Sequence, residues 1–396
     1  MESIIKMSRV SENHRKVNSY YFSPLLLKKK VSKRTLVSQQ ASRTTMKKPI
    51  KPETADSNSI SKNSFTYNYA IGRGGFGKVW KVDLKRTKQQ FALKEMQKLR
   101  VISKRSVHSV MNERKILETL NDPFIVNMNS AFQDRENLYL VLDLKNGGDL
   151  RYHISKVKKF NEVQAKFIVA CIACGLNYIH SNGILHRDIK PENLVFDERG
   201  YLFITDFGIA RIWTAENSKD TSGTPGYMAP EVIFRQNHGI AVDYFALGVI
   251  LYELMMGRRP YVGRDRKEIR DHILSKQAKI VEVPEGWGIE AADFVNKMIQ
   301  RKAGCRLGSR GFAEVKDHPW LKDFPWKELC ERSITAPFIP KSQDNFDPRS
   351  LGDWKDEIEP GIDLAASQGL FSGYSYDPRV LVEKKNISHK KSLSLI

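Results

Sequence analysis

The chain has 396 residues, of which 41% are hydrophobic, and it carries a formal net charge of +20. This length exceeds what one hydrophobic core usually supports, so we expect more than one structural unit. Four cysteines are too few for a disulfide framework. This count excludes a disulfide-stapled secreted domain and favours reduced thiols in the cytoplasm or the nucleus.

Residues 1–64 are predicted to form a basic extension without a fixed fold. Up to Lys51 there are thirteen lysines and arginines against two acidic residues, and aromatic side chains are few. The simplest interpretation is a solvated regulatory extension. The charge also suits an acidic partner, nucleic acid or an anionic membrane surface, whereas Glu2 and Glu12 argue against a mitochondrial presequence.

A glycine-rich pattern follows, with Gly72, Gly74 and Gly77 in the spacing G-x-G-x-x-G. Alone this pattern is weak, because it also opens dinucleotide-binding folds when a helix follows it. Here residues 79–84 alternate as a strand, and residues 91–94 begin another. The loop therefore joins two strands, where its backbone N–H groups can approach a triphosphate closely.

Lys94 falls in the second of these strands, where it can grip the α- and β-phosphates of a nucleotide. Apolar residues then recur at helical spacing over residues 107–120, and Glu113 lies off their stripe. Glu113 is thus free to pair with Lys94. Such a pair would hold the ammonium group in place.

The most informative stretch is His186–Asn193, which is followed by Asp206-Phe207-Gly208. Asp188 can accept or orient the proton of an attacking hydroxyl, while Asn193 and Asp206 can hold Mg²⁺ against nucleotide phosphates. Each residue alone has a structural interpretation, such as a loop carboxylate or a turn cap. Their joint order indicates phosphoryl transfer from ATP.

Together these motifs resemble those of a eukaryotic protein kinase, and the resemblance spans residues 65–321. The implied fold is α+β and bilobal. A β-rich small lobe would cover residues 65–142 and a mostly helical large lobe residues 143–321. ATP and Mg²⁺ would lie between the two lobes.

The resemblance implies roles for further residues. In this family Glu231, from the Ala-Pro-Glu motif, pairs with Arg306, and Asp243 braces the catalytic loop. Lys190 is the form found in serine/threonine kinases and implies Ser or Thr acceptors, and Thr224 supports it. The catalytic residues implied are Lys94, Glu113, Asp188, Lys190, Asn193 and Thr224.

The nucleotide contacts follow from the same resemblance. The backbone of residues 143–145 should hydrogen-bond the adenine edge, and Asp149 should meet the ribose hydroxyls or the substrate. The implied contacts are Ile71, Gly72, Gly74, Gly77, Val79, Ala92, Lys94, Asp143, Lys145, Asp149, Val195 and Phe346.

Residues 322–396 look like the C-terminal tail of the AGC group of kinases, which wraps back over the small lobe. Ala336–Pro340 and Asn345–Asp347 carry this likeness. In the group the second motif brings a phenylalanine, here Phe346, to the adenine pocket. Phe371–Tyr376 resembles the phosphorylatable hydrophobic motif of AGC kinases.

Substrate preference and branch can also be read from the resemblance. Gly147–His153 and Gly257–Tyr261 are similar to the "yet another novel kinase" branch of the AGC group, from which the hydrophobic motif is a departure. Asp149, Glu192 and Glu253 match positions where basophilic AGC kinases carry carboxylates facing the substrate. Arg or Lys is therefore expected on the N-terminal side of the acceptor, unless these carboxylates serve other purposes.

Two regulatory features are expected. Many AGC kinases carry a phosphorylated Thr at the position of Asp220, and Arg187 would bind that phosphate. The Asp220 carboxylate should therefore partly order the activation segment, which lies between the Asp-Phe-Gly and Ala-Pro-Glu motifs. Thr221 or Ser222 is the alternative, as a site for an upstream kinase. The aromatic residues of segment 371–376 should dock beside the helix that carries the paired glutamate, with Ser375 as a phosphorylation site, unless the tail is idle.

Two other classes of function fit the chain less well. A kinase-fold scaffold without catalysis would be expected to lose Lys94, Asp188, Asn193 or Asp206, and all four are present. A nucleic-acid-binding protein would need basic residues interleaved with aromatic ones. The expected assignment is a monomeric protein kinase that acts on protein substrates in the cytoplasm or the nucleus.

Overall fold

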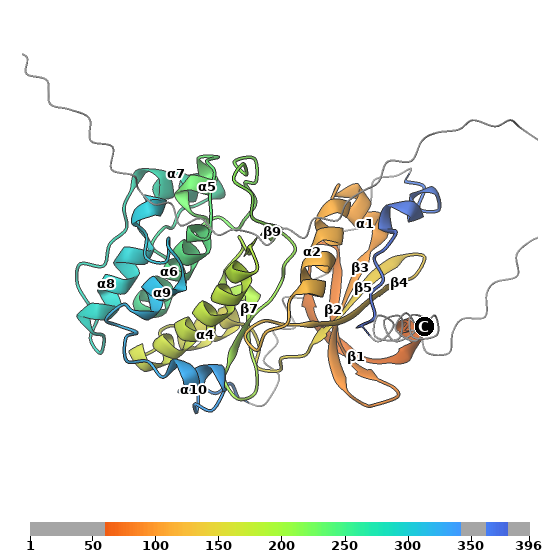
Figure 1. The fold of residues 1–396 in the computed structure, drawn as a ribbon, viewed down its shortest axis with the longest axis horizontal. Helices are drawn as coiled ribbons and strands as arrows, with labels where there is room; N and C mark the ends of the chain where they lie inside the picture. Colours follow the sequence, from red (N-terminus) through yellow and green to blue (C-terminus); the bar gives the residue numbers. More distant parts are fainter. Residues whose placement is uncertain (1–59, 342–361, 379–396) are drawn as a thin grey trace, which may run out of the picture. The chain divides into compact units, whose positions relative to one another are not determined.

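The computed structural model describes residues 60–341 and 362–378, which belong to one compact unit. Figure 1 shows a sheet-rich part, coloured orange to yellow, and a helical part, coloured green to cyan. This is the α+β kinase architecture that the sequence predicts. Residues 1–59 and Phe346 lie outside the described residues.

The small lobe is a five-stranded antiparallel sheet in the order β1-β2-β3-β5-β4. Its strands are β1 (Phe65–Arg73), β2 (Gly77–Leu84), β3 (Gln90–Gln97), β4 (Met128–Gln133) and β5 (Asn137–Asp143). A short 3-10 turn, η1 (Lys62–Ser64), precedes the sheet, and helices α1 (Lys98–Ser103) and α2 (Val107–Thr119) connect β3 to β4. The glycine-rich loop thus joins β1 to β2, as predicted.

Strand β3 shows how the sheet aims its side chains. Phe91 and Leu93 belong to a cluster on one face, whereas Ala92 and Met96 belong to the main core, which includes the buried side chains of α2. Successive residues of a strand point to opposite faces. Lys94 shares the parity of Ala92 and Met96 and therefore points to the face that α2 covers.

The large lobe is mostly helical. Its helices are α3 (Leu150–Val157), α4 (Glu162–Ser181), α5 (Pro230–Ile233), α6 (Ala241–Met256), α7 (Arg266–Ser275), α8 (Ile289–Met298), α9 (Phe312–Lys316) and α10 (Trp326–Cys330). The lobe also contains two antiparallel strand pairs, β6 (Ile184–Leu185) with β9 (Arg211–Ile212) and β7 (Leu194–Phe196) with β8 (Leu202–Ile204). The short 3-10 turn η2 (Pro191–Asn193) lies between β6 and β7 in the chain. A further turn, η3 (Ala303–Cys305), follows α8.

Helix α4 lies at the centre of this lobe. Of the described helices it alone is long and apolar enough to cross a membrane, judged by length and composition only, and 61% of its most apolar window is buried inside the lobe. Asn161 caps its N-terminus by accepting a hydrogen bond from the Gln164 N–H at 2.9 Å. Packing in the core accounts for its apolar composition.

The chain after α10 divides into two described stretches. In the first, the Phe338 ring packs within 5.5 Å of the rings of His153, Phe160 and Phe196, so it stays on the large lobe. The second, residues 362–378, contains the 3-10 helix η5 (Ala366–Phe371) and lies against the small lobe, as the blue segment of Figure 1 shows. The expected return of the tail to the small lobe is therefore seen at residues 362–378.

Candidate active site

One buried carboxylate fixes the backbone of the catalytic loop just before Asp188. Asp243, on α6 and only 1% exposed, accepts hydrogen bonds from the His186 N–H at 3.0 Å and the Arg187 N–H at 2.7 Å. His180 Nε2 lies 2.8 Å from the same carboxylate. Burial acts to raise the pKa of Asp243, but the hydrogen bond from His180 and the nearby histidines outweigh burial and lower the pKa. The brace predicted from the resemblance is thus present in the geometry.

The carboxylate of Asp188 is held by three neighbouring side chains. Lys190 Nζ lies 2.6 Å from Oδ2, the Thr224 hydroxyl donates to Oδ1 at 2.7 Å, and Asn193 Nδ2 donates to Oδ2 at 3.1 Å. Lys190 also donates to the Thr224 hydroxyl at 2.9 Å. The side chain of Asp188 remains 12% exposed. Its oxygens are therefore oriented at a site that an incoming hydroxyl can reach.

Lys94 meets two carboxylates from different parts of the chain. Its Nζ lies 2.6 Å from Glu113 Oε1 on α2 and 3.2 Å from Asp206 Oδ1. Burial acts to lower the pKa of Lys94, but the charges of Asp206 and Glu113 raise it above its ordinary value. Lys94 in turn holds the pKa of Asp206 below its ordinary value. Burial raises the pKa of Glu113, and the charge of Lys94 opposes this effect. The Lys94 ammonium is therefore kept charged between two carboxyl groups, which suits an electrostatic site for phosphates.

The three glycines of the β1–β2 loop serve two purposes. A Cβ added at Gly72 or Gly74 would meet nothing closer than 3.7 Å, so these two leave open space for a phosphate. A Cβ at Gly77 would lie 1.6 Å from the Glu95 carbonyl oxygen on β3. Gly77 is thus required by the pairing of β2 with β3 as well as by any ligand.

The residues expected to contact adenine come from β1, β2 and β3 of the small lobe and from β7 of the large lobe. Ile71, Val79 and Val195 are partly buried against the main core, and Ala92 is 8% exposed. The N–H of Asp143, at the end of β5, already donates to the Asn127 carbonyl at 3.0 Å. Its carbonyl is consequently the atom of this residue that suits an adenine amino group.

Asp149 and Lys145 have structural partners that the sequence did not reveal. Asp149 caps the N-terminus of α3 by accepting a hydrogen bond from the Tyr152 N–H at 2.7 Å, and burial raises the pKa of its carboxyl. Lys145 Nζ lies 4.0 Å from the centroid of the Phe203 ring. For both residues a contact with ATP stays a prediction.

The expected magnesium ligands are brought together by the β7–β8 hairpin. The Thr205 N–H donates to the Asn193 carbonyl at 3.0 Å, so Asn193 and Asp206 lie at adjoining positions of the hairpin. The amide nitrogen of Asn193 is taken by Asp188, which leaves its oxygen for a metal. Asp206 is 47% exposed. One carboxylate and one amide oxygen suit Mg²⁺, which usually completes its shell with substrate phosphates and water.

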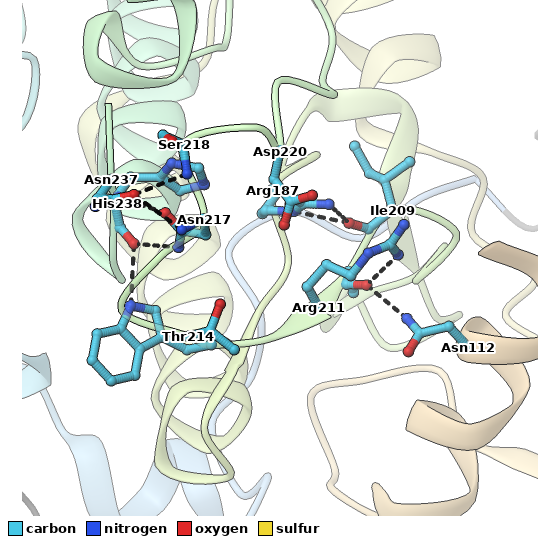
Figure 2. A network of polar contacts seen from close by, with 12 residues as sticks. Asn112, Arg187, Ile209, Arg211, Thr214, Asn217, Ser218, Asp220, Asn237 and His238 are labelled. Carbon is cyan, nitrogen blue, oxygen red and sulfur yellow. Dashed lines mark hydrogen bonds and ion pairs between the residues drawn. The ribbon is translucent and has the colours of Figure 1, made fainter. Parts of the chain in front are cut away.

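Arg187 and Asp220 form the ion pair expected from the sequence. Arg187 Nη1 lies 3.1 Å from Asp220 Oδ2, and the guanidinium also donates to the Ile209 carbonyl at 2.9 Å and 2.6 Å. Figure 2 shows this pair beside Arg211 and Asn217, whose side chains donate to the carbonyls of Ala210 and His238. The Arg187 side chain is only 3% exposed. A buried guanidinium here needs an anion, and Asp220 supplies it.

The C-terminal aromatic motif docks beside α2, as predicted. Phe371 and Tyr374 are fully buried, whereas Ser375 is exposed. Tyr376 extends β4 by exchanging backbone hydrogen bonds with Ala131 at 2.7 Å and 2.8 Å.

Two buried basic residues that the sequence analysis did not single out hold this segment. Arg114 on α2 donates to the carbonyls of Tyr374 at 2.8 Å and Gly373 at 3.0 Å. Lys98, 1% exposed, donates to Gln368 Oε1 at 2.7 Å. The sequence does not distinguish them from other basic residues of α1 and α2, because their burial follows only from the folded structure.

We expect Phe371→Ala to lower activity at least several-fold, because losing a buried aromatic side chain costs roughly 3–5 kcal/mol. The segment would then detach from α2 and release the helix that positions Glu113. Steady-state peptide phosphorylation measures this effect. Leu370→Ala is the matched control, since Leu370 is 51% exposed. Equal activities of the two variants would contradict a role for docking.

The geometry can be set beside known proteins. Residues 65–321 match the family model described as protein kinase domain. The chain belongs to this family. Several relatives are similar over most of its length. A probable serine/threonine-protein kinase of Dictyostelium discoideum is 37% identical over 81% of this chain and 72% of its own length.

Other relatives are kinases of the AGC type. Serine/threonine-protein kinase sgk-1 of Caenorhabditis elegans is 37% identical over 76% of this chain and 65% of its own length. The cAMP-dependent protein kinase catalytic subunit of Dictyostelium discoideum is 36% identical over 72% of this chain and 44% of its own length. The similarity therefore reaches beyond the matched domain into the flanking segments of this kinase.

Proposed function

We propose that this kinase transfers the γ-phosphoryl group of ATP to Ser or Thr hydroxyls of protein substrates. It is a serine/threonine protein kinase and a phosphotransferase. The observation that carries the proposal is the Asp188 carboxylate, which Lys190 and Thr224 hold from both sides at 2.6 Å and 2.7 Å. Asp188 accepts or orients the proton of the acceptor hydroxyl, and Lys190 offsets the negative charge that develops beside it.

The nucleotide and its metal are held by a second set of residues, Lys94, Asn193 and Asp206. Bound Mg·ATP supplies the phosphoryl group and a metal charge that neutralises its oxygens. Lys94, kept charged and positioned by Glu113 at 2.6 Å, binds the α- and β-phosphates. Asn193 and Asp206 hold the metal. The presence of all four groups that a scaffold would be expected to lose favours catalysis over a scaffold role. These groups are Lys94, Asp188, Asn193 and Asp206.

The direct test is phosphorylation of a degenerate Ser/Thr peptide library in the presence of Mg·ATP. Wild-type enzyme should label Ser and Thr acceptors and leave Tyr acceptors unlabelled. The Asp206→Ala variant should label neither class above background. Equal labelling by wild type and variant would refute the proposed function, since Asp206 is required to hold the metal.

We further propose that Asp220 makes the enzyme active without phosphorylation of its activation segment. Asp220 carries the charge that Arg187 pairs with at 3.1 Å, and its carboxylate is 41% exposed. Because a charge-assisted hydrogen bond is worth about 1.5–3 kcal/mol, Asp220→Asn should lower the activity of phosphatase-treated enzyme on the order of tenfold.

The matched variant for this switch is Asp220→Glu, which keeps the charge and should retain most of the activity. Thr221→Ala should change little in the same assay, because the built-in carboxylate replaces the phosphate. If dephosphorylated wild type is inactive and Asp220→Asn has no effect, phosphorylation of Thr221 by an upstream kinase becomes the switch instead.

Several finer predictions rest on the sequence. Assignment to the "yet another novel kinase" branch is supported by Gly147–His153 and Gly257–Tyr261, whereas the docked motif at 371–376 favours the wider AGC group. An acidic partner or anionic membrane for residues 1–64 follows from their charge. A monomeric state, a cytoplasmic or nuclear location and phosphorylation of Ser375 complete this set.

A further inference from the structure

Arg151, on the first turn of α3, binds two carboxylates that come from distant parts of the chain. Its Nε donates to Glu192 Oε1 at 2.8 Å. Its Nη1 and Nη2 donate to the two oxygens of Glu253 at 2.8 Å and 3.1 Å. Nη2 also donates to the Tyr227 hydroxyl, which in turn donates to Glu253 Oε2 at 2.8 Å. One guanidinium thus ties together α3, η2, α6 and the end of the activation segment.

Glu253 is the most buried of these charged groups and therefore depends most on its partners. The side chain of Glu253 is 8% exposed, that of Arg151 30% and that of Glu192 45%. A carboxylate as buried as Glu253 is costly unless a cation and hydrogen-bond donors satisfy it. Arg151 supplies both through a two-point contact, the geometry in which guanidinium binds carboxylate best.

The cluster lies beside the catalytic group. Glu192 follows Asp188 within the same loop, whose Asn193 donates to the Asp188 carboxylate at 3.1 Å. Tyr227 follows Thr224, which donates to the other oxygen of Asp188 at 2.7 Å. A peptide whose hydroxyl reaches Asp188 must therefore place neighbouring residues close to the cluster.

Without Arg151, this surface would present two uncompensated carboxylates to the peptide. An arginine or lysine near the acceptor would then gain an ion pair with them. With Arg151 in place the two carboxylates already have their cation, and a basic peptide side chain would have to displace a partly buried guanidinium that makes four hydrogen bonds. Two of the three carboxylates that the sequence offered as a site for basic residues, Glu192 and Glu253, are thus occupied from within the chain, and the third, Asp149, caps α3.

We propose that Arg151 is a specificity-determining residue that fills the acidic site of Glu192 and Glu253, so that this kinase selects little for basic residues upstream of the acceptor. The inference rests on the proposed kinase function and revises the expectation of Arg or Lys before the acceptor. The substrate class it names is Ser/Thr segments with neutral upstream residues, accepted about as well as basic ones.

The test compares two peptides. One has Arg at all three positions before the acceptor, and the other has Ala at these positions. The readout is the ratio of kcat/KM for the Arg and the Ala peptide, because effects common to both substrates cancel in this ratio. For the full-length wild-type chain we expect a ratio below about threefold. Arg151→Gln should raise the ratio about tenfold or more, which corresponds to about 1.4 kcal/mol of discrimination.

Two further variants separate a charge effect from a packing effect. Arg151→Lys keeps the cation but loses the two-point contact with Glu253, so its ratio should lie between those of wild type and Arg151→Gln. Lys156→Gln removes the same charge from an exposed position of the same helix and should leave the ratio unchanged. Adding Glu253→Gln to Arg151→Gln should remove most of the gained preference.

The outcomes are distinct. A wild-type ratio above about threefold overturns the inference without any variant, so a failure of Arg151→Gln to fold does not block the test. An Arg151→Gln ratio equal to that of wild type also overturns it and leaves Arg151 as a structural tie only. Absence of phosphotransfer to every peptide, with wild type no better than Asp206→Ala, instead refutes the proposed kinase function and the inference with it.

Discussion

Asp188→Asn and Asp206→Asn are each expected to abolish measurable phosphotransfer, by different routes. Asp188→Asn removes the group that takes or orients the proton and leaves Lys190 and Thr224 without their anionic partner at 2.6 Å and 2.7 Å. Removing a preorganised charged group from such a site costs on the order of 10² in rate or more. Peptide phosphorylation at saturating Mg·ATP measures the loss.

The two variants should differ in nucleotide binding. Asp206→Asn removes a carboxylate of the expected metal site and the partner that Lys94 meets at 3.2 Å, so Mg²⁺-dependent ATP affinity should fall. Asp188→Asn should bind Mg·ATP nearly as well as wild type, since Asp188 is assigned to the acceptor side. Calorimetric titration with and without Mg²⁺ separates the two routes. Turnover like that of wild type in either variant would disprove the assigned roles.

Arg306→Ala is expected to cause a large loss of stability in the large lobe. The Arg306 side chain is 0% exposed and contacts Glu231 through two bonds of 2.7 Å and 3.0 Å. Its guanidinium also donates to the Ala241 carbonyl at 2.8 Å and lies over the Phe245 ring. Removing one partner of a buried pair leaves an uncompensated charge, which costs roughly 3–5 kcal/mol.

The readout is the midpoint of thermal unfolding, which should fall on the order of 10 °C for a domain of this size. Arg310→Ala is the matched control, because Arg310 pairs with Glu314 but is 85% exposed. Exposed pairs contribute about 0–1 kcal/mol, so its midpoint should barely move. A shift for Arg306→Ala no larger than that of the control would show that the buried pair adds little.

Sequence patterns alone were enough to predict the fold class and to propose the reacting groups. Lys94, Asp188 and Asp206 were identified because each belongs to a short motif whose residue types suit one task, and because the motifs occur in one order. The alternation of residues along strands and the helical spacing of apolar residues also predicted local secondary structure. Each motif and each periodic pattern spans only a short stretch of the chain, so it can be recognised without knowing how the chain packs.

The tertiary structure decided which charged groups meet. Arg151 pairs with residues 41 and 102 positions away, and Arg114 binds a carbonyl 260 positions away. The chain has 65 lysines and arginines and 45 acidic residues, so the sequence offers very many equivalent pairs. Only the packing of α3 against η2 and α6, and of residues 362–378 against α2, selects among them, because Coulomb attraction depends on distance and burial rather than on order along the chain.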